Sequence, residues 1–422
     1  MIIIYNFIAL VILLIYFPVY LLRRKFHSGL WQRLGVLPKS LNLGKPIWIH
    51  AVSVGEAAAC RGLVDGLRKI YPEKKFVIST VTTTGNKIAQ TIAQPGDFVC
   101  YLPLDFSFFV KKVINRVNPS LFIIAETEIW PNLITCLWKK GIPVAVVNAR
   151  ISDGSFRGYF MLRAFLKPIL RRISLFCAQT QVDADRLMAI GAEVDKIKVT
   201  GNMKFDLSRR EYSEKDCSNF KEKLAITFKE KLLVAGSTHS GEEKIILEVY
   251  KSLLEDLPGL RLLIAPRHPE RAEEVGVLIR SFGFEPLRTS SLNPSNPSNS
   301  ITIFVLDTIG ELLNYYAIAD IVFVGGSLIK KGGHNILEPA SLAKPIIFGQ
   351  YMFNFRDTAN LFLKNSAAIQ VNNAKELQDK ISVLLNDVDL GISMGKNAQK
   401  LIRENLGATQ RNIKLIETLS LK

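Results

Sequence analysis

Short apolar runs of four to six residues recur along most of the chain, and stretches with helical spacing separate them. In the first half these runs are Ile47–Val52, Phe76–Val81, Phe98–Leu102, Leu121–Ala125, Val144–Asn148, Leu175–Ala178 and Ile197–Thr200. In the second half they are Leu232–Ala235, Leu262–Ala265, Ile301–Leu306, Ile321–Val324, Pro345–Phe348 and Ala367–Val371. Near-continuous apolar strands that alternate with helices are typical of a parallel sheet covered on both faces. The two series therefore predict an α/β protein with two Rossmann-like, doubly wound domains facing a cleft.

A polar segment, Asp206–Phe220, lacks apolar periodicity and separates the two series. We therefore expect a first domain over residues 26–210 and a second over residues 211–422. The turn-rich segment Thr289–Ser300 precedes an apolar run, so we expect a surface loop inside the second domain. The final segment, Gly395–Lys422, has a helical pattern, and its helix is expected to pack back on the first domain.

The first 22 residues are almost entirely apolar, with Asn6 as their one strongly polar side chain. Because about 20 apolar residues in a helix span a bilayer, residues 1–25 are predicted to form a membrane anchor. Arg23, Arg24 and Lys25 follow the run, and the positive-inside rule then places the two domains on the cytoplasmic face. The alternatives are a helix that enters only one leaflet and a buried first helix of the globular protein.

The net charge of +16 is concentrated in the first half of the chain. Residues 1–205 hold 27 Lys and Arg against 12 Asp and Glu, whereas residues 206–422 hold 27 against 26. This asymmetry indicates that the first half faces an extended anion, either nucleic acid or an anionic membrane surface, and the alternative is a generically basic proteome. The five cysteines are scattered and show no CxxC spacing, which fits a reducing compartment better than a disulfide framework.

Three polar motifs follow apolar runs of the first half. In WIHAVSVGE a strand enters a tight turn and a helix begins, so Glu56 either accepts the proton of an attacking hydroxyl or returns to the Ser53 amide in a capping box. A helix N-terminus favours the ionised carboxylate and predicts a weak base. Glu126 and Glu128 follow the run Leu121–Ala125, either as ligand-facing acids or as a helix start. Lys204 meets an anion or is simply solvated.

The second half carries three further motifs. The segment AGSTHSGEE predicts a small polar turn whose amides hold a phosphate at a helix N-terminus. Arg267 and His268 follow the next run and suit a phosphate or a base. In GGSLIKKGGHNILEP four glycines allow close approach of the backbone to a ligand, while Asn335 with Glu338 also fits a simple helix cap. The five His are far apart and no DxD pair punctuates a loop in the manner of a metal-dependent sugar transferase, so we predict neither a metal nor a cofactor.

Taken together, these motifs resemble the 3-deoxy-D-manno-octulosonic acid (Kdo) transferases of lipopolysaccharide assembly. The resemblance covers nearly the whole chain, including the N-terminal run. It is carried by HAVSVGEA, AETEIWPNL, NARISDGSF, GNMKFD, AGSTHSGEE, PRHPER and GGSLIKKGGHNILEPA. Lys330, Lys331 and Ile336 depart from the family pattern, which more often has less basic residues and a Pro at these positions.

The resemblance implies a GT-B fold at the cell inner membrane, with CMP-Kdo as donor and the tetraacylated lipid A precursor (lipid IVA) as acceptor. It implies inversion without a metal, Glu56 as catalytic base, and Glu126 and Lys204 as groups that stabilise the transition state. The implied CMP site consists of Arg267, His268, Ile309, Gly310, Glu311, Asn335, Ile336, Leu337 and Glu338. Further candidate donor contacts are Ser237, Thr238, Gly333 and His334.

Three alternatives stay open on the sequence. A lipid-directed transferase that uses a UDP-sugar shares the fold and a basic membrane face. A nucleotide-sugar epimerase shares the fold and needs neither a lipid nor an anchor. A nucleic-acid binder would use the basic half, but the sequence holds no RRM, KH or helix-turn-helix signature, so we predict no nucleic-acid partner.

Overall fold

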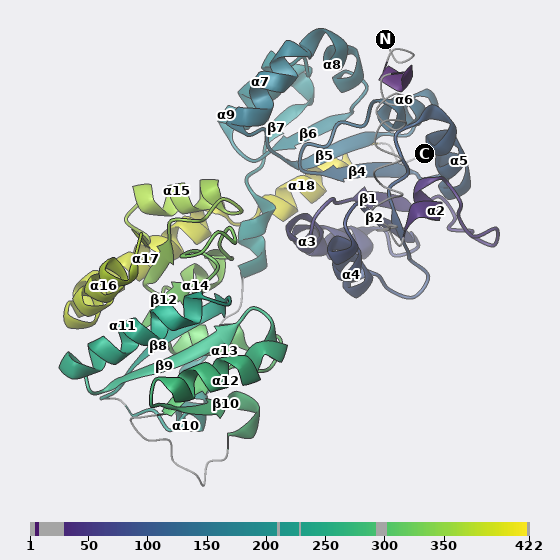
Figure 1. The fold of residues 1–422 in the computed structure, drawn as a ribbon. Helices are drawn as coiled ribbons and strands as arrows, with labels where there is room; N and C mark the ends of the chain where they lie inside the picture. Colours follow the sequence, from purple (N-terminus) through teal and green to yellow (C-terminus); the bar gives the residue numbers. More distant parts are fainter. Residues whose placement is uncertain (1–4, 8–28, 209–211, 228, 293–301, 420–422) are drawn as a thin grey trace. The chain divides into compact units, whose positions relative to one another are not determined.

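The computed structural model describes residues 5–7, 29–208, 212–227, 229–292 and 302–419 (Figure 1). The chain divides into two compact units. Unit 1 comprises residues 1–207 and 405–422, and unit 2 comprises residues 208–404. Each unit contains a seven-stranded sheet whose neighbouring strands are parallel. The prediction of two parallel-sheet α/β domains is therefore confirmed.

The sheet of unit 1 has the strand order β3-β2-β1-β4-β5-β6-β7. All seven strands fall on predicted apolar runs, because most of their residues are buried on both faces. The strands are β1 (Ile47–His50), β2 (Phe76–Thr80), β3 (Phe98–Tyr101), β4 (Leu121–Ala125), β5 (Val144–Ala149), β6 (Leu175–Ala178) and β7 (Ile197–Val199).

Helices cover both faces of the first sheet and form two separate cores. One core joins the sheet to α3, α4 and α18, and the other joins it to α5, α6, α8 and α9. The helices of unit 1 are α2 (Leu30–Arg33), α3 (Val54–Ile70), α4 (Thr83–Ile92), α5 (Ser107–Val117), α6 (Pro131–Lys139), α7 (Asp153–Met161), α8 (Arg163–Leu170), α9 (Gln181–Ala189) and α18 (Ala408–Glu417). The 3-10 turns Val194–Lys196 and Met203–Ser208 follow α9 and β7.

The sheet of unit 2 has the strand order β10-β11-β9-β8-β12-β13-β14. The strands are β8 (Lys231–Thr238), β9 (Leu260–Pro266), β10 (Glu285–Arg288), β11 (Thr302–Val305), β12 (Ile321–Val324), β13 (Ile346–Gly349) and β14 (Ile369–Val371). Strand β10 does not fall on any of the predicted apolar runs. This edge strand reads EPLR and is largely exposed, so it lacks the apolar run that marks a strand buried on both faces.

The helices of unit 2 are α10 (Glu214–Lys223), α11 (Glu242–Asp256), α12 (Ala272–Ser281), α13 (Leu312–Ile318), α14 (Leu337–Ser341), α15 (Arg356–Lys364), α16 (Ala374–Asn386) and α17 (Val388–Asn405), with 3-10 turns at Pro269–Arg271 and Thr289–Ser291. Helix α10 lies in the segment that we expected to be an irregular boundary. It has no buried residue, which explains the missing periodicity, and a capping box between Ser213 and Asp216 starts it. Most of the predicted loop at 289–300 lies outside the described residues.

In each sheet the first strand of the unit lies next to a strand from a later part of that unit, so the order of the strands reverses there. In unit 1 the reversal lies between β1 and β4, and in unit 2 it lies between β8 and β12. In unit 1 the helix that follows β1 covers one face and the helix that follows β4 covers the other. In an open α/β sheet, this topological switch point at the carboxyl ends of the strands is where ligands bind.

The predicted membrane anchor is corrected by the structure. In the part of the chain that the structure describes, no helix is both long enough and apolar enough to cross a membrane. Most of residues 1–25 lie outside the described ranges, but Tyr5–Phe7 are described. The Asn6 side chain donates to Ser107 Oγ at 3.1 Å and accepts from Asn132 Nδ2 at 2.8 Å. The polar residue of the apolar run thus binds unit 1, and the localisation inferred from an anchor is withdrawn.

Asp206 ties the two chain segments of unit 1 together. Its Oδ1 accepts from the Gly407 amide at 2.7 Å, and its Oδ2 accepts from the Thr409 amide at 2.7 Å. Gly407 is the N-cap of α18 and has no side chain with which to cap the helix. Asp206 therefore supplies the missing cap from a position 201 residues earlier in the chain.

We predict that Asp206→Ala lowers the free energy of unfolding of unit 1 by about 1–2 kcal/mol, since a helix cap and a charge-assisted hydrogen bond are lost. Urea unfolding followed by circular dichroism measures the change. Asp195→Ala, at an exposed position of the same unit, is the matched control. Equal stability of the two variants would contradict the capping role.

Candidate functional site

Glu56 stands at the switch point of unit 1, on the first turn of α3. Its Oε2 accepts from the Val52 amide at 2.7 Å, and its Oε1 accepts from Ser53 Oγ at 2.8 Å. The carboxylate thus returns to the amide before the N-cap, whereas we expected the amide of Ser53 itself. The side chain is buried, although the turn that precedes it is partly open. The capping arrangement and a place at the carboxyl end of β1 therefore coexist.

The pKa of Glu56 is raised, which reverses the expectation of a weak base. Burial is the largest cause, and the negative charge of Glu126 adds to it. The hydrogen bonds from Val52 and Ser53 and the cation of Lys204 act in the opposite direction and do not outweigh it. Loss of solvent at the switch point therefore makes this carboxylate a stronger proton acceptor than an exposed one.

Glu126 and Lys204 meet although 78 residues separate them in the chain. Lys204 Nζ donates to Glu126 Oε1 at 2.8 Å, and both side chains are about three-quarters buried. Glu126 follows β4 with a φ of 61°, a left-handed conformation that is costly for a residue with a side chain. Residues with strained backbone conformations cluster at active sites, so this conformation of Glu126 is typical of a functional site.

Glu128 completes a cluster of three carboxyl groups, and we did not include it among the predicted site residues. Burial, followed by the charges of Glu56 and Glu126, raises its pKa to about 7. The sequence did place Glu128 next to Glu126 at the end of a buried strand. That signal was available, but the competing helix-start interpretation explained Glu128 equally well. In the structure α6 begins at Pro131, beyond both carboxylates.

In unit 2, five of the predicted donor contacts line one cavity of about 350 Å³. They come from the ends of β8 and β9 and from the loop that follows β11, and they are Ser237, Arg267, His268, Ile309 and Gly310. Ile309 is 89% exposed, so this apolar side chain is open to a ligand rather than part of the core. Glu311 lies beside the cavity and accepts a hydrogen bond from Thr308.

Residues 325–336, which connect β12 to α14, form a glycine loop. A carboxylate of the protein itself occupies three backbone amides of this loop. Glu242, which is fully buried, accepts from the amides of Gly326, Ser327 and Leu328 at 2.7, 3.1 and 3.0 Å. Burial raises the pKa of Glu242, and these hydrogen bonds oppose the rise. Thr238 is also buried and donates to Glu243 at 3.0 Å. The amides of Gly326, Ser327 and Leu328 are therefore not available to a phosphate, whereas the phosphate contact predicted for the turn that follows β8 stays a prediction.

The remaining predicted contacts gather around the start of α14. Asn335 Oδ1 accepts from the Leu337 amide at 3.1 Å, and its Nδ2 donates to Glu338 Oε1 at 3.1 Å. Helix α14 begins at Leu337 with Ile336 as N-cap, so Asn335 is not the N-cap that the alternative interpretation required. Ile336 and Leu337 are buried, and only their backbone is suited to a ligand.

His334 and Gly333 precede that helix. Gly333 donates to the Gly326 carbonyl at 2.8 Å, and its φ of 72° lies in the left-handed region that favours glycine. His334 Nε2 lies 2.8 Å from Nε2 of His239, a residue that we did not predict. Burial, then the neighbouring Arg267 and two histidines, lowers the pKa of His334 to about 4.

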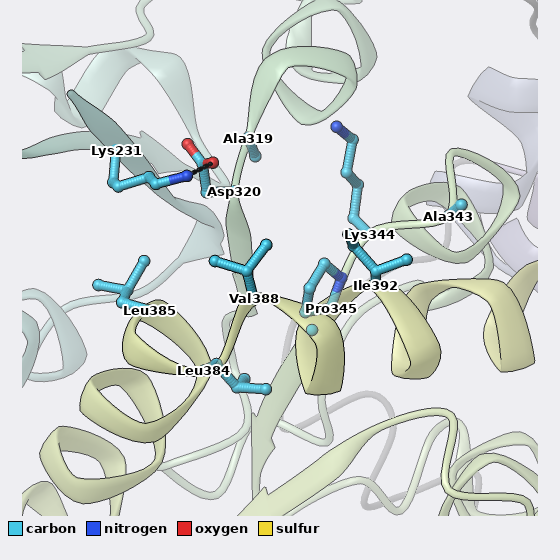
Figure 2. Close-up of a pocket in the computed structure, with 11 residues that line it drawn as sticks. Lys231, Ala319, Asp320, Ala343, Lys344, Pro345, Leu384, Leu385, Val388 and Ile392 are labelled. Atoms are coloured by element: carbon cyan, nitrogen blue, oxygen red, sulfur yellow. Dashed lines mark hydrogen bonds and ion pairs between the residues drawn. The ribbon is translucent and has the colours of Figure 1, made fainter. Parts of the chain in front are cut away.

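A second hollow of unit 2 lies at the opposite edge of the sheet (Figure 2). It has a volume of about 190 Å³ and lies at the starts of β8, β12 and β13 and against α16 and α17. Lys231 and Asp320 form an ion pair of 3.2 Å at its rim. It contains no predicted site residue, so the candidate chemistry gathers at the carboxyl ends of the strands. Within the described ranges, no group of three or more His, Cys, Asp or Glu residues could hold a metal ion.

We predict that Glu128→Gln stabilises the protein at pH 8 but much less at pH 5. The folded pKa of about 7 exceeds the ordinary carboxyl value near 4.3. Stability is therefore lost as pH rises between these two values, and the full penalty applies above the folded pKa. A thermal melt at each pH measures the difference, and a rise of at least ~2 °C at pH 8 corresponds to ~1 kcal/mol in a domain of this size.

Glu73→Gln is the control for this measurement, because Glu73 is an exposed carboxyl group of the same unit. A gain that is the same at both pH values, or that Glu73→Gln reproduces, would show that Glu128 ionises normally.

Comparison with known proteins identifies the family. A family model described as 3-Deoxy-D-manno-octulosonic-acid transferase (kdotransferase) matches residues 28–207. A 3-deoxy-D-manno-octulosonic acid transferase of Haemophilus influenzae is 36% identical over 374 residues, which cover 88% of this chain and 86% of the relative. A protein of the same description from Bordetella pertussis is 30% identical over 381 residues, which cover 89% and 87%.

Among solved structures, a UDP-N-acetylglucosamine 2-epimerase is similar with a TM-score of 0.56, over 89% of this chain and 96% of that chain. At 13% sequence identity, this likeness shows a shared fold and nothing about the reaction. The two relatives, by contrast, match over most of both chains, and their sequence identities of 36% and 30% are higher than a shared fold alone would give. The chain therefore belongs to the 3-deoxy-D-manno-octulosonic acid transferase family and is a glycosyltransferase.

Proposed function

We propose that this protein transfers Kdo from CMP-Kdo to the tetraacylated lipid A precursor, with inversion at the anomeric carbon and without a metal ion. Family membership supports Kdo transfer in lipopolysaccharide biosynthesis. The proposed mechanism of transfer rests on the cluster of Glu56, Glu126 and Lys204 at the switch point of unit 1. Such a cluster has the groups that a direct displacement at a sugar carbon needs.

Glu56 is the catalytic base in this proposal. Its raised pKa gives it a higher affinity for the proton of the acceptor hydroxyl than an exposed carboxylate has. The two hydrogen bonds from Val52 and Ser53 fix the plane of the carboxylate before the acceptor arrives. A base that is held in place loses little conformational freedom in the transition state.

Glu126 and Lys204 act on the charge that develops during transfer. As the bond to CMP breaks, the anomeric carbon gains oxocarbenium character, which a nearby carboxylate stabilises. The cation of Lys204 orients Glu126 and opposes the rise in the pKa of Glu56, so it favours the ionised form of the base. Glu128 shares the site, and its pKa of about 7 means that it carries a proton for part of the time at neutral pH.

Unit 2 binds the CMP moiety in this proposal. Arg267 and His268 line the cavity at the end of β9, where a cation suits a phosphate. Glu338 accepts from Asn335 and is suited to ribose hydroxyls, while Ile309 offers an exposed apolar surface to the base. The basic first half of the chain, with a net charge of +15 over residues 1–205, favours an acceptor that carries phosphates and an anionic lipid surface around it.

The direct test incubates the purified protein with CMP-Kdo and lipid A precursor in the presence of EDTA and weighs the lipid by mass spectrometry. We expect a gain of one or more Kdo units. Glu56→Gln should lower the rate by about 10²–10⁴-fold, the usual contribution of a positioned general base. Glu73→Gln is the matched control and should retain full activity. An unchanged lipid with intact CMP-Kdo would refute the proposal, and UDP-sugars would then be tried as donors.

The pH dependence tests the role of Lys204. Because this cation lowers the pKa of Glu56, Lys204→Met should move the acid limb of the kcat/KM profile to higher pH. Lys204→Arg keeps the charge and should leave the limb near its original position. Lys198→Met removes an exposed cation of the same unit and serves as control. An acid limb that stays at the same pH in Lys204→Met would show that Lys204 does not influence the pKa of the catalytic base.

A further inference from the structure

Two histidines meet at the switch point of unit 2. His239 follows β8, and His334 belongs to the loop that follows β12. Their Nε2 atoms are 2.8 Å apart, their ring planes differ by 10°, and their ring centres are 5.1 Å apart. Face-to-face rings could not bring two nitrogens so close, so the rings meet edge to edge. One ring must donate an N–H and the other must accept it.

The glycine loop makes the space for this pair. A Cβ at Gly326 would lie 3.0 Å from His334 Cδ2 and 3.4 Å from His239 Cδ2, and the φ of Gly326 is 67°. The amide of Gly326 is fixed by the buried carboxylate of Glu242 at 2.7 Å. The loop is thus held rigidly in a conformation that admits both rings, which argues that the pair is a built feature of the site.

An N–H···N bond limits the charge of the pair. It can be neutral or carry one added proton, because a second added proton would place hydrogens on both facing nitrogens. The groups that face His239 are Lys331, His268, Arg271 and Glu243, and those that face His334 are Arg267 and His268. Burial and these mainly cationic neighbours lower the pKa of both histidines. In the absence of a ligand, the pair is therefore neutral at neutral pH.

The pair adjoins the candidate donor cavity. The ring centre of His239 is 6.2 Å from that of His268, which lines the cavity together with Arg267. The backbone amides of the glycine loop are occupied by Glu242, so they are not available to a phosphate. The histidine pair and Arg267 are side chains that can instead meet an anion beside this loop.

We propose that the His239–His334 pair binds the phosphate of the donor nucleotide and takes up one proton from solvent as the phosphate arrives. The proposal rests on the CMP site proposed above. An arriving anion offsets the surrounding cations, so the pair can hold a proton that it cannot hold alone. His239 was not predicted as a contact from the sequence. It positions His334, and the hydrogen bond between the two rings limits how many protons the pair can hold.

The added proton also suits the departure of CMP. When the bond between the sugar carbon and the phosphate oxygen breaks, both electrons remain on the oxygen and the phosphate gains a second negative charge. The proton of the pair can then hydrogen-bond to, or pass to, that oxygen, while the acceptor oxygen bonds to the sugar carbon and its proton goes to Glu56. The proton taken up by the pair and the proton on Glu56 both return to solvent when the products leave, so each turnover releases one net proton and restores both groups.

Calorimetric titration of the full-length protein with CMP at pH 8, in two buffers that differ in ionisation enthalpy, counts the protons taken up. We expect close to one proton per CMP, and none with cytidine, which lacks the phosphate. In His239→Gln the uptake should largely disappear and CMP affinity should fall by about tenfold, as expected for a lost charge-assisted contact. His334→Gln should behave alike, and circular dichroism checks that both variants are folded.

CMP binding by the wild type without proton uptake, or unchanged uptake in both folded variants, would overturn the role of the pair and leave the CMP site intact. Absence of CMP binding by the wild type would instead overturn the proposed CMP site together with this role. The two failures are therefore distinguishable.

Discussion

The reversal of strand order in each sheet is the constraint on which both candidate sites depend. Between β1 and β4, and again between β8 and β12, neighbouring strands send their chains away to different helices. No connecting segment therefore fills the space at the carboxyl ends of these strands, and side chains can converge there. Glu56 and Glu126 meet at the first reversal, and His239 and His334 meet at the second. Residues far apart in sequence become neighbours because the topology leaves them this space.

Buried carboxylates hold the turns around these reversals in place. Glu242 binds three amides of the glycine loop, Glu56 binds the Val52 amide, and Asp105 binds the amides of Asn132 and Leu133 at 3.0 and 2.9 Å. Each carboxylate satisfies amides that would otherwise be costly to bury. Burial at the same time raises the pKa of Glu56, Glu242 and Asp105. The burial that accompanies these turn-stabilising hydrogen bonds thus also raises the pKa of Glu56, the residue that we propose as catalytic base.

The fold was largely predictable because strands buried on both faces leave apolar runs in the sequence, whereas the exposed edge strand β10, with Pro286, leaves none. The placing of Glu56 and Lys204 at strand ends was likewise visible. Their electrostatics were not, since the raised pKa of Glu56 depends on burial and on Glu126, which lies 70 residues away. The pairing of His239 with His334, the filling of the glycine loop by Glu242 and the binding of Asn6 to Asn132 are tertiary facts that no local pattern carries.

The titration of Glu56 itself tests the assignment of the base most directly. Carbon-13 NMR of protein labelled at the glutamate carboxyl carbons, compared with Glu56→Gln to assign the signal, gives the pKa without reference to turnover. A midpoint above the ordinary carboxyl value near 4.3 is predicted, because burial and Glu126 outweigh the hydrogen bonds and Lys204. A midpoint at or below that value would contradict the prediction, since Glu56 would then be a helix cap whose ionised form the protein simply stabilises.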